Sequence, residues 1–268
     1  MATVRCAYVD GHLGQIHLRL AGLGSGSQKR PLLCFHMSPY SGVIYERFVS
    51  ELGNERLTVA PDTPGFGNSD VSIHPPEIED YAQAMADVID ALELRSVDVM
   101  GYHTGSETAV ELARQRPGHV HRLVMVSAPI WSEQERKTRP QIFSVTKVSE
   151  DGSHLQAWWQ SAMYWSMKGR NLDDIGRVFP VRCLNPDISY WGHRAAHNYD
   201  LAAALKEVYQ PILVLNPDDD LVDFTPRAAP LLQNPDSYIL DLPGWSHGFL
   251  DLKCQETAKI VRDFVDDG

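Results

Sequence analysis

Residues 97–118, VDVMGYHTGSETAVELARQRPG, hold the strand, turn and helix on which the interpretation of the whole chain depends. Residues 97–100 form a short run typical of a buried strand. Residues 104–116 have the apolar spacing of an amphipathic helix, which the following proline and glycine end. The turn between them has the pattern Gly-x-His-x-Gly, and its two glycines allow a bend at which side chains would collide with neighbouring backbone. We therefore predict a sharp strand-to-helix turn with His103 at its centre.

The same alternation of short strands and amphipathic helices continues along the chain. Short apolar runs bounded by turn residues are typical of buried parallel strands. We predict strands at 4–9, 15–20, 32–35, 57–60, 97–100, 123–126, 212–215 and 238–240, and helices at 76–94, 104–116 and 257–265. Alternating strands and helices predict an α/β fold with a mostly parallel sheet covered by helices on both faces. We expect residues 1–268 to form a single domain.

The segment from about 129 to 209 interrupts this alternation. It contains no clear strand, and loops of such length are uncommon in compact domains, so we predict an inserted, mainly helical lid. Lids exclude water and shape apolar pockets. We therefore expect at least two of its tryptophans to line a substrate pocket, although they might instead only pack the lid onto the core. Five of the six tryptophans lie in this segment: Trp131, Trp158, Trp159, Trp165 and Trp191.

Composition and charge exclude several classes of partner. The chain is 43% hydrophobic and 22% charged, as ordinary globular proteins are. Its formal net charge of -11 repels phosphate backbones and anionic lipid surfaces, so we expect neither a nucleic acid nor a membrane as partner. The first ten residues lack the basic and apolar regions of a signal peptide. Four scattered cysteines without a C-x-x-C pair are typical of reduced thiols, so we expect a cytoplasmic protein. We expect it to be a monomer or a homodimer.

Four segments with chemically useful side chains follow predicted strands. They are 34–39 (CFHMSP), 101–105 (GYHTG), 216–220 (NPDDD) and 244–248 (GWSHG). In an open α/β sheet, ligands bind beyond the carboxyl ends of the strands, so these segments are expected to meet there. In chain order they offer a loop for an oxyanion, a turn residue, an acid and a base.

Residues 62–70, DTPGFGNSD, resemble the D-x-P-G-x-G-x-S-D stretch of the lidded α/β-hydrolase superfamily. Its lidded members include esterases, meta-cleavage-product carbon–carbon hydrolases, haloalkane dehalogenases and epoxide hydrolases. The order of the four segments is also that of the superfamily, and the resemblance covers almost the whole chain outside the predicted lid. It implies an α/β-hydrolase fold, a small-molecule substrate and no cofactor.

The chain departs from this superfamily at the residue that normally attacks the substrate. That turn usually reads G-x-S-x-G, with cysteine or aspartate as variants, whereas here the central residue is His103. Its imidazole is a nucleophile, a general base, or a remnant in an inactive protein that binds a ligand. A helix N-terminus and a second imidazole both disfavour an imidazolium, so we expect His103 to be neutral at pH 7. Ser106, on the helix, is expected to face away from the pocket.

The resemblance assigns roles to the other site residues. His247 matches the base, and Asp219 matches the acid whose carboxylate would orient His247. Asp218 and Asp220 are expected to be solvated loop residues. Two backbone N–H groups, of Met37 and Thr104, match an oxyanion hole. The hydroxyl of Ser38 would add to it or line the pocket.

A few other residues suggest weaker hypotheses. His193 and His197 have the i, i+4 spacing of a metal-binding pair. A glutamate after the first histidine and a third ligand are both absent from the sequence, so we predict no metal site. His36 and Asp62 are expected to be structural.

These observations favour an enzyme that hydrolyses an ester, lactone, thioester or activated carbon–carbon bond. The substrate is expected to be a small carbonyl compound with an apolar or aromatic part. One alternative is a lyase, isomerase or cyclase without cofactor, in which His103 moves a proton and no water is added. A second alternative is an inactive, ligand-binding homologue. Fold alone does not decide among these.

Overall fold

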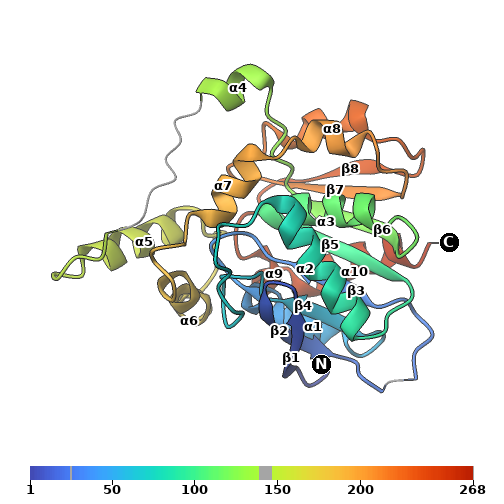
Figure 1. The fold of residues 1–268 in the computed structure, drawn as a ribbon, viewed down its shortest axis with the longest axis horizontal. Coiled ribbons are helices and arrows are strands. Elements are labelled where there is room, and N and C mark those ends of the chain that lie inside the picture. The colour runs from blue at the N-terminus through green and yellow to red at the C-terminus, as the bar shows by residue number, and fades with distance from the viewer. Residues whose placement is uncertain (25, 139–146, 268) are drawn as a thin grey trace.

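The computed structural model describes residues 1–24, 26–138 and 147–267, and its centre is one sheet between two layers of helices (Figure 1). The strands are β1 (Arg5–Gly11), β2 (Gly14–Ala21), β3 (Leu32–Phe35), β4 (Thr58–Pro61), β5 (Val97–Tyr102), β6 (Val120–Val126), β7 (Ile212–Pro217) and β8 (Tyr238–Leu242). The α-helices are α1 (Glu46–Leu52), α2 (Ile78–Ala91), α3 (Thr104–Gln115), α4 (Glu133–Thr138), α5 (Ser153–Tyr164), α6 (Leu172–Val178), α7 (Trp191–Asn198), α8 (Leu201–Leu205), α9 (Phe249–Leu252) and α10 (Cys254–Val265). Short 3-10 helices lie at η1 (Gly42–Tyr45), η2 (Phe179–Cys183) and η3 (Thr225–Leu231).

The eight strands are arranged in the order β1-β2-β4-β3-β5-β6-β7-β8. The β1–β2 and β2–β4 pairs are antiparallel, and every pair from β4 to β8 is parallel. The α/β-hydrolase fold predicted from the sequence is confirmed. Each predicted strand lies within two or three residues of an observed one, and the main difference is the antiparallel edge that β1 and β2 form.

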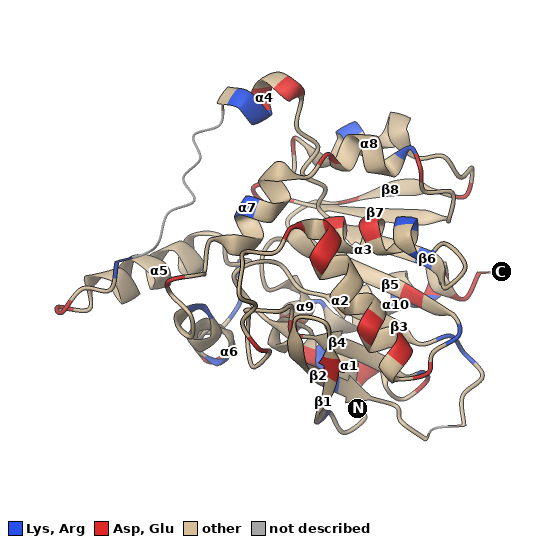
Figure 2. Cartoon of the chain, in the orientation of Figure 1, with Lys and Arg blue, Asp and Glu red and all other residues tan. Residues whose placement is uncertain are grey.

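Two apolar layers cover the sheet because the helices are amphipathic. One layer contains the buried faces of α2 and α3 against the sheet, and the other contains those of α1 and α10. In α2 the buried positions recur at helical spacing: Ile78, Tyr81, Ala82, Met85, Val88 and Ile89. The acidic residues Glu79, Asp80 and Asp90 occupy outer positions of α2, in keeping with the net charge of -11 (Figure 2).

The register of the parallel strands brings their carboxyl ends together. Phe35 of β3 pairs with Gly101 of β5, and Tyr102 pairs with Val126 of β6. Val126 in turn pairs with Leu215 of β7. Side chains that follow these strands therefore lie along one edge of the sheet. Among the described residues, no helix has the length and apolar character needed to cross a membrane.

Helices α4 to α8 belong to the chain between β6 and β7, where the sequence predicts a lid. Figure 1 shows α5 and α6 extending away from the sheet, whereas α7 and α8 lie close to it. Part of the predicted lid, residues 139–146, lies outside the described ranges.

The turn between β5 and α3 is as tight as its glycines predict. A Cβ on Gly101 would lie 2.1 Å from the carbonyl oxygen of Gly105, and a Cβ on Gly105 would lie 2.1 Å from the carbonyl oxygen of Phe35. His103 has φ 49° and ψ -113°, a strained conformation for a residue with a side chain. Its N–H donates to the carbonyl oxygen of Val126 at 2.9 Å, which fixes the turn to β6.

We predict that Gly105→Ala lowers the free energy of unfolding by about 2 kcal/mol, because the new methyl group meets backbone that has no free space to move into. Urea denaturation followed by circular dichroism measures the change. Gly176→Ala in α6 is the matched control, since a Cβ there would meet no described atom within 4 Å. We expect this control to be neutral or stabilising. Equal stability of Gly105→Ala and wild type would contradict the steric argument.

Candidate active site

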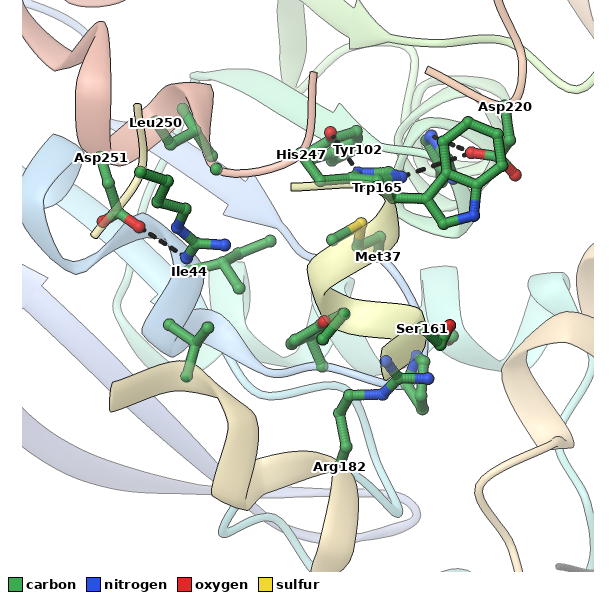
Figure 3. Close-up of a pocket in the computed structure, with 18 of the residues that line it drawn as sticks. Met37, Ile44, Tyr102, Ser161, Trp165, Arg182, Asp220, His247, Leu250 and Asp251 are labelled. Atoms are coloured by element: carbon green, nitrogen blue, oxygen red, sulfur yellow. Dashed lines mark hydrogen bonds and ion pairs between the residues drawn. The ribbon is translucent and has the colours of Figure 1, made fainter. Parts of the chain in front are cut away.

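A cavity of about 200 Å³ lies at the carboxyl edge of the sheet (Figure 3). On the sheet side it is lined by Met37, Ser38, Tyr102, His103, Asp220 and His247. On the other side it is lined by residues from the insertion between β6 and β7, which include Ser161, Trp165, Arg170, Arg182 and His193. The cavity is therefore enclosed jointly by strand-end loops and by the insertion.

The imidazole of His103 forms a hydrogen bond with the carboxylate of Asp219. The distance from His103 Nε2 to Asp219 Oδ2 is 2.9 Å. Asp219 is only 3% exposed, and two further donors hold its carboxylate. The Ser127 hydroxyl donates to Oδ2 at 2.6 Å, and the Leu221 N–H donates to Oδ1 at 2.9 Å. The carboxylate is thus fixed behind the ring of His103.

This arrangement differs from the expected pairing of Asp219 with His247. An imidazole reaches much further from the backbone than the serine that usually occupies the turn. At position 103 it extends past the end of β6 to the loop after β7, and its Nε2 contacts Asp219 directly. His103 therefore takes the partner that the resemblance assigned to His247.

His247 contacts two other groups. Its Nδ1 lies 2.8 Å from the hydroxyl of Tyr102, and its Nε2 lies 3.4 Å from Asp220 Oδ1. The rings of His103 and His247 have centroids 5.2 Å apart, and Trp165 lies edge-on to His247 (Figure 3). Asp220 is exposed, as expected of a loop residue, and it also lines the cavity, where its Oδ1 is 3.8 Å from His103 Nε2.

The charges in the site shift several pKa values. Burial lowers the pKa of His103, but the carboxylates of Asp219 and Asp220 outweigh it, and the pKa is raised above the ordinary histidine value. Burial raises the pKa of Asp219, and the nearby His103 more than offsets this and lowers it. Burial, together with His103 and Arg182, lowers the pKa of His193 to about 4, so His193 is neutral at pH 7. The sequence predicted a neutral His103 from the helix N-terminus and the second imidazole. It did not predict the direct contact with the Asp219 carboxylate, which favours the protonated ring.

The loop after β3 is held in place by His36 and Asp62. His36 Nδ1 donates to the carbonyl oxygen of Met37 at 3.0 Å, and its Nε2 accepts from the N–H of Thr63 at 2.8 Å. Burial lowers the pKa of His36, in keeping with this neutral tautomer. Asp62 accepts from the N–H groups of Gly42 and Asn68 and from Arg19. Both residues thus have the structural contacts expected of them.

The two backbone groups predicted for an oxyanion hole lie at this edge. Met37 lines the cavity, and Thr104 directly follows His103. Within the described part of the chain, neither N–H donates a hydrogen bond to another residue. Ser106 is fully buried and donates to the carbonyl oxygens of Gly101 and Val126, so it faces away from the cavity as expected.

Of the five tryptophans predicted to line the pocket, only Trp165 does so. Trp131 packs on Phe224, Trp158 on His154 and Trp159 on Phe179. Trp191 is 7% exposed and lies beside the backbone of Gly65. The expectation of at least two is therefore not met, because most of these rings pack within the insertion or onto the body of the domain.

The sequence analysis did not identify several residues of the cavity wall. The sequence could have indicated Tyr102 and Asp220, since each is adjacent in sequence to a predicted site residue. The indication for Ser127 was weaker and rests on its place directly after β6. For Arg170 and Arg182 there was none, because their position depends on how the insertion folds over the sheet.

Comparison with known proteins places the chain in a family. The family model described as alpha/beta hydrolase fold matches residues 30–250. The chain therefore belongs to the α/β hydrolase fold family, and we class it as a hydrolase. What it acts on is considered below.

Individual relatives are distant in sequence. The 2-(acetamidomethylene)succinate hydrolase of Mesorhizobium japonicum is 23% identical, over 95% of this chain and 93% of the relative. The 2-hydroxy-6-oxo-2,4-heptadienoate hydrolase of Pseudomonas putida is 31% identical over 43% of this chain and 42% of the relative. The crystal structure of the enol-lactonase from Burkholderia xenovorans LB400 has a TM-score of 0.79 at 18% identity, with coverage of 97% of this chain and 100% of that one. At this identity the structural likeness shows the fold alone.

We predict that Asp219→Asn lowers the pKa of His103, because it removes the negative charge that stabilises the imidazolium. The measurement is an NMR titration of the imidazole signals after dialysis against a chelator, with Asp223→Asn as a control in the same loop. The raised pKa of His103 also makes the stability of the fold depend on pH. A raised folded-state pKa stabilises the fold below about pH 6.5, and this stabilisation is lost as the pH rises through the folded-state value. An unchanged His103 pKa in Asp219→Asn would show that the carboxylate does not control it.

Proposed function

We propose that the chain hydrolyses a small carbonyl compound that carries a carboxylate, with His103 and Asp219 as its central catalytic pair. The reacting bond is that of an ester, a lactone, a thioester or an activated carbon–carbon bond. The observation that carries this proposal is the 2.9 Å hydrogen bond from a cavity-lining imidazole to a buried carboxylate. Such a pair makes the imidazole a stronger base and stabilises its protonated form.

The chemistry follows from the hydrogen bond. When Nε2–H donates to Asp219, a neutral His103 carries its lone pair on Nδ1. That nitrogen accepts a proton from a water molecule as the water oxygen bonds to the substrate carbonyl carbon. The resulting imidazolium is stabilised by Asp219, which accounts for the role of a fixed carboxylate behind the ring. His103 then gives this proton to the leaving group, which returns its ring to the neutral form.

The backbone supports the same reaction. The N–H groups of Met37 and Thr104 are the proposed oxyanion hole, because backbone donors near the turn stabilise the charge that develops on the carbonyl oxygen. This role does not depend on the side chain at either position. These backbone donors are therefore present whether the turn residue is serine or histidine.

A carboxylate on the substrate is proposed because of Arg182. Its guanidinium lines the cavity opposite His247 and Asp220 (Figure 3). Its Nη1 makes a 3.5 Å contact to the carbonyl oxygen of Trp158, and in the described ranges it has no carboxylate partner. Its Nε is buried without a hydrogen bond. A planar guanidinium with unused donors suits a carboxylate.

The relatives support this substrate class. The names of the Mesorhizobium and Pseudomonas hydrolases, a succinate and a heptadienoate hydrolase, both denote carboxylates. The sequence predicted a largely aromatic pocket, whereas the cavity wall combines Arg182 with Trp165, the only one of the five predicted tryptophans that lines it.

The insertion between β6 and β7 is the proposed lid, over about residues 129–209 of a single domain. Ser161, Trp165 and Arg182 bring it to the cavity. The N–H of Met167 donates to the carbonyl oxygen of His247 at 2.8 Å, which ties the insertion to the loop that carries that histidine. Closure of this kind excludes water and strengthens the interactions inside.

We predict that His103→Ala lowers kcat/KM for a carboxylate-bearing 4-nitrophenyl ester by about 10²- to 10⁴-fold, the usual contribution of a general base. His74→Asn, on the surface, is the control histidine and is expected to match wild type. Intact-mass analysis after a rapid quench is expected to show no acyl adduct on His103, whereas an adduct would assign it as a nucleophile. Full activity of His103→Ala would refute the proposed function. Activity of His103→Ser alone, with wild type inert, would do so as well.

We predict that Arg182→Met raises KM for 4-nitrophenyl hydrogen succinate about 10- to 100-fold, the equivalent of one lost charge-assisted hydrogen bond. The KM for the neutral 4-nitrophenyl acetate is expected to change little, because that ester has no carboxylate. Arg95→Met, at an exposed position, controls for loss of net charge. Equal effects on both esters would show that Arg182 acts on the structure of the insertion and does not bind the substrate.

A further inference from the structure

We propose that His103, Asp219, Asp220 and His247 form a binding site for one divalent transition-metal ion, with Zn²⁺ as the best match to the ligand set. One ligand atom from each of the four residues lies within 4.8 Å of all the others. The inference goes beyond the proposed function, because a bound ion would replace the proton that His103 Nε2 donates to Asp219 in the metal-free chain. Its binding can be measured whether or not the chain hydrolyses anything.

The distances between the ligand atoms fit a shared ion. Zn²⁺ binds imidazole nitrogen and carboxylate oxygen at about 2.0 to 2.2 Å, so neighbouring ligand atoms in its shell are about 3 to 4 Å apart. The observed separations from His103 Nε2 are 2.9 Å to Asp219 Oδ2 and 3.8 Å to Asp220 Oδ1. His247 Nε2 is 3.4 Å from Asp220 Oδ1. The remaining pairs of ligand atoms lie within 4.8 Å, so the side chains have to close by up to about 1 Å to share one ion at these bond lengths.

The position of Asp220 favours a shared ion over two separate histidine–aspartate pairs. Two separate pairs would need one carboxylate for each ring, whereas Asp220 Oδ1 lies within 4 Å of both Nε2 atoms. The two ring nitrogens and the two carboxylate oxygens thus lie close enough together to share one ion. Imidazole with carboxylate is a common ligand combination for zinc and iron.

Groups behind the ligands hold them as metal ligands are usually held. The Tyr102 hydroxyl lies 2.8 Å from His247 Nδ1, so Nδ1–H can donate to it and leave the Nε2 lone pair for an ion. The Ser127 hydroxyl donates to the Asp219 oxygen that contacts His103. Such contacts fix ring orientation and tautomer in metal sites.

The charge of the cluster also suits a cation. Asp219 and Asp220 bring two carboxylates together, and in the described residues no lysine or arginine forms an ion pair with either. Their charges are balanced only by the two imidazoles. The cavity lies beside His103 and His247, so a water molecule or a substrate oxygen would join the four protein ligands as a fifth, the largest number usual for zinc. A bound ion would supply a water of lowered pKa at this place.

The sequence predicted no metal site because His193 and His197, a pair of possible ligands close together in the chain, lack a third ligand. The four residues proposed here come from three separate loops, after β5, β7 and β8. Only the fold brings them together. The turn residue that departs from the superfamily, His103, then has a chemical purpose that serine could not serve.

The test is metal binding by the purified chain. Protein stripped with dipicolinate is titrated with ZnCl₂ by calorimetry and with Co²⁺ by visible absorption, which reports coordination by nitrogen and oxygen ligands. We expect one ion per chain, with affinity weakened at least about 10- to 100-fold in His103→Gln and in Asp220→Asn, since even second-shell changes have effects of that size. Tyr102→Phe is expected to weaken binding less.

Two control variants make the result specific. Asp223→Asn removes a carboxylate from the same loop, and His74→Asn removes a surface imidazole, and both are expected to bind the ion as wild type does. Circular dichroism confirms that each variant is folded. The proposal is overturned if wild type binds neither ion at millimolar concentration, or if His103→Gln and Asp220→Asn bind as tightly as wild type. Ester hydrolysis that persists in excess chelator would support the proposed function without an ion, whatever the outcome of the binding experiments.

Discussion

The turn at His103 is the constraint on which the site depends. Gly105 lies so close to the Phe35 carbonyl that no side chain fits between them, and the backbone of His103 is forced to a positive φ. This geometry lifts the residue above the sheet edge, whatever its side chain is. With serine the turn would present a hydroxyl. With histidine it presents a ring long enough to reach the buried carboxylate of Asp219. With histidine in the turn, Asp219 pairs with residue 103, and His247 contacts Tyr102 and Asp220.

Much of the fold was predictable, because the information is local. Residues 32–35 were predicted as a strand and are one, and the buried positions of α2 follow the spacing of its apolar residues. The antiparallel pairing of β1 and β2 and the short helix α1 were not predicted, because they depend on packing against distant parts of the chain. The residues that meet at the sheet edge were also predictable from their places after strands.

The contacts among those residues were less predictable. The resemblance assigned Asp219 to His247 because it assumed a short side chain at position 103. The sequence gives no measure of how far a ring reaches across a turn, so the exchange of partners is visible only in three dimensions. The wall of the cavity was harder still. Arg182 and Trp165 reach it through the folding of the insertion, whereas Trp131 and Trp159 pack on other aromatic rings.

The cavity has facing walls, with the carboxylate of Asp220 at the sheet edge and the guanidinium of Arg182 on the insertion. The backbone hydrogen bond from Met167 to His247 joins these walls. The insertion therefore cannot swing away from the sheet without pulling on the main chain at His247. If the insertion opens as proposed to release a product, His247 would be displaced from its contacts with Tyr102 and Asp220 in the same movement.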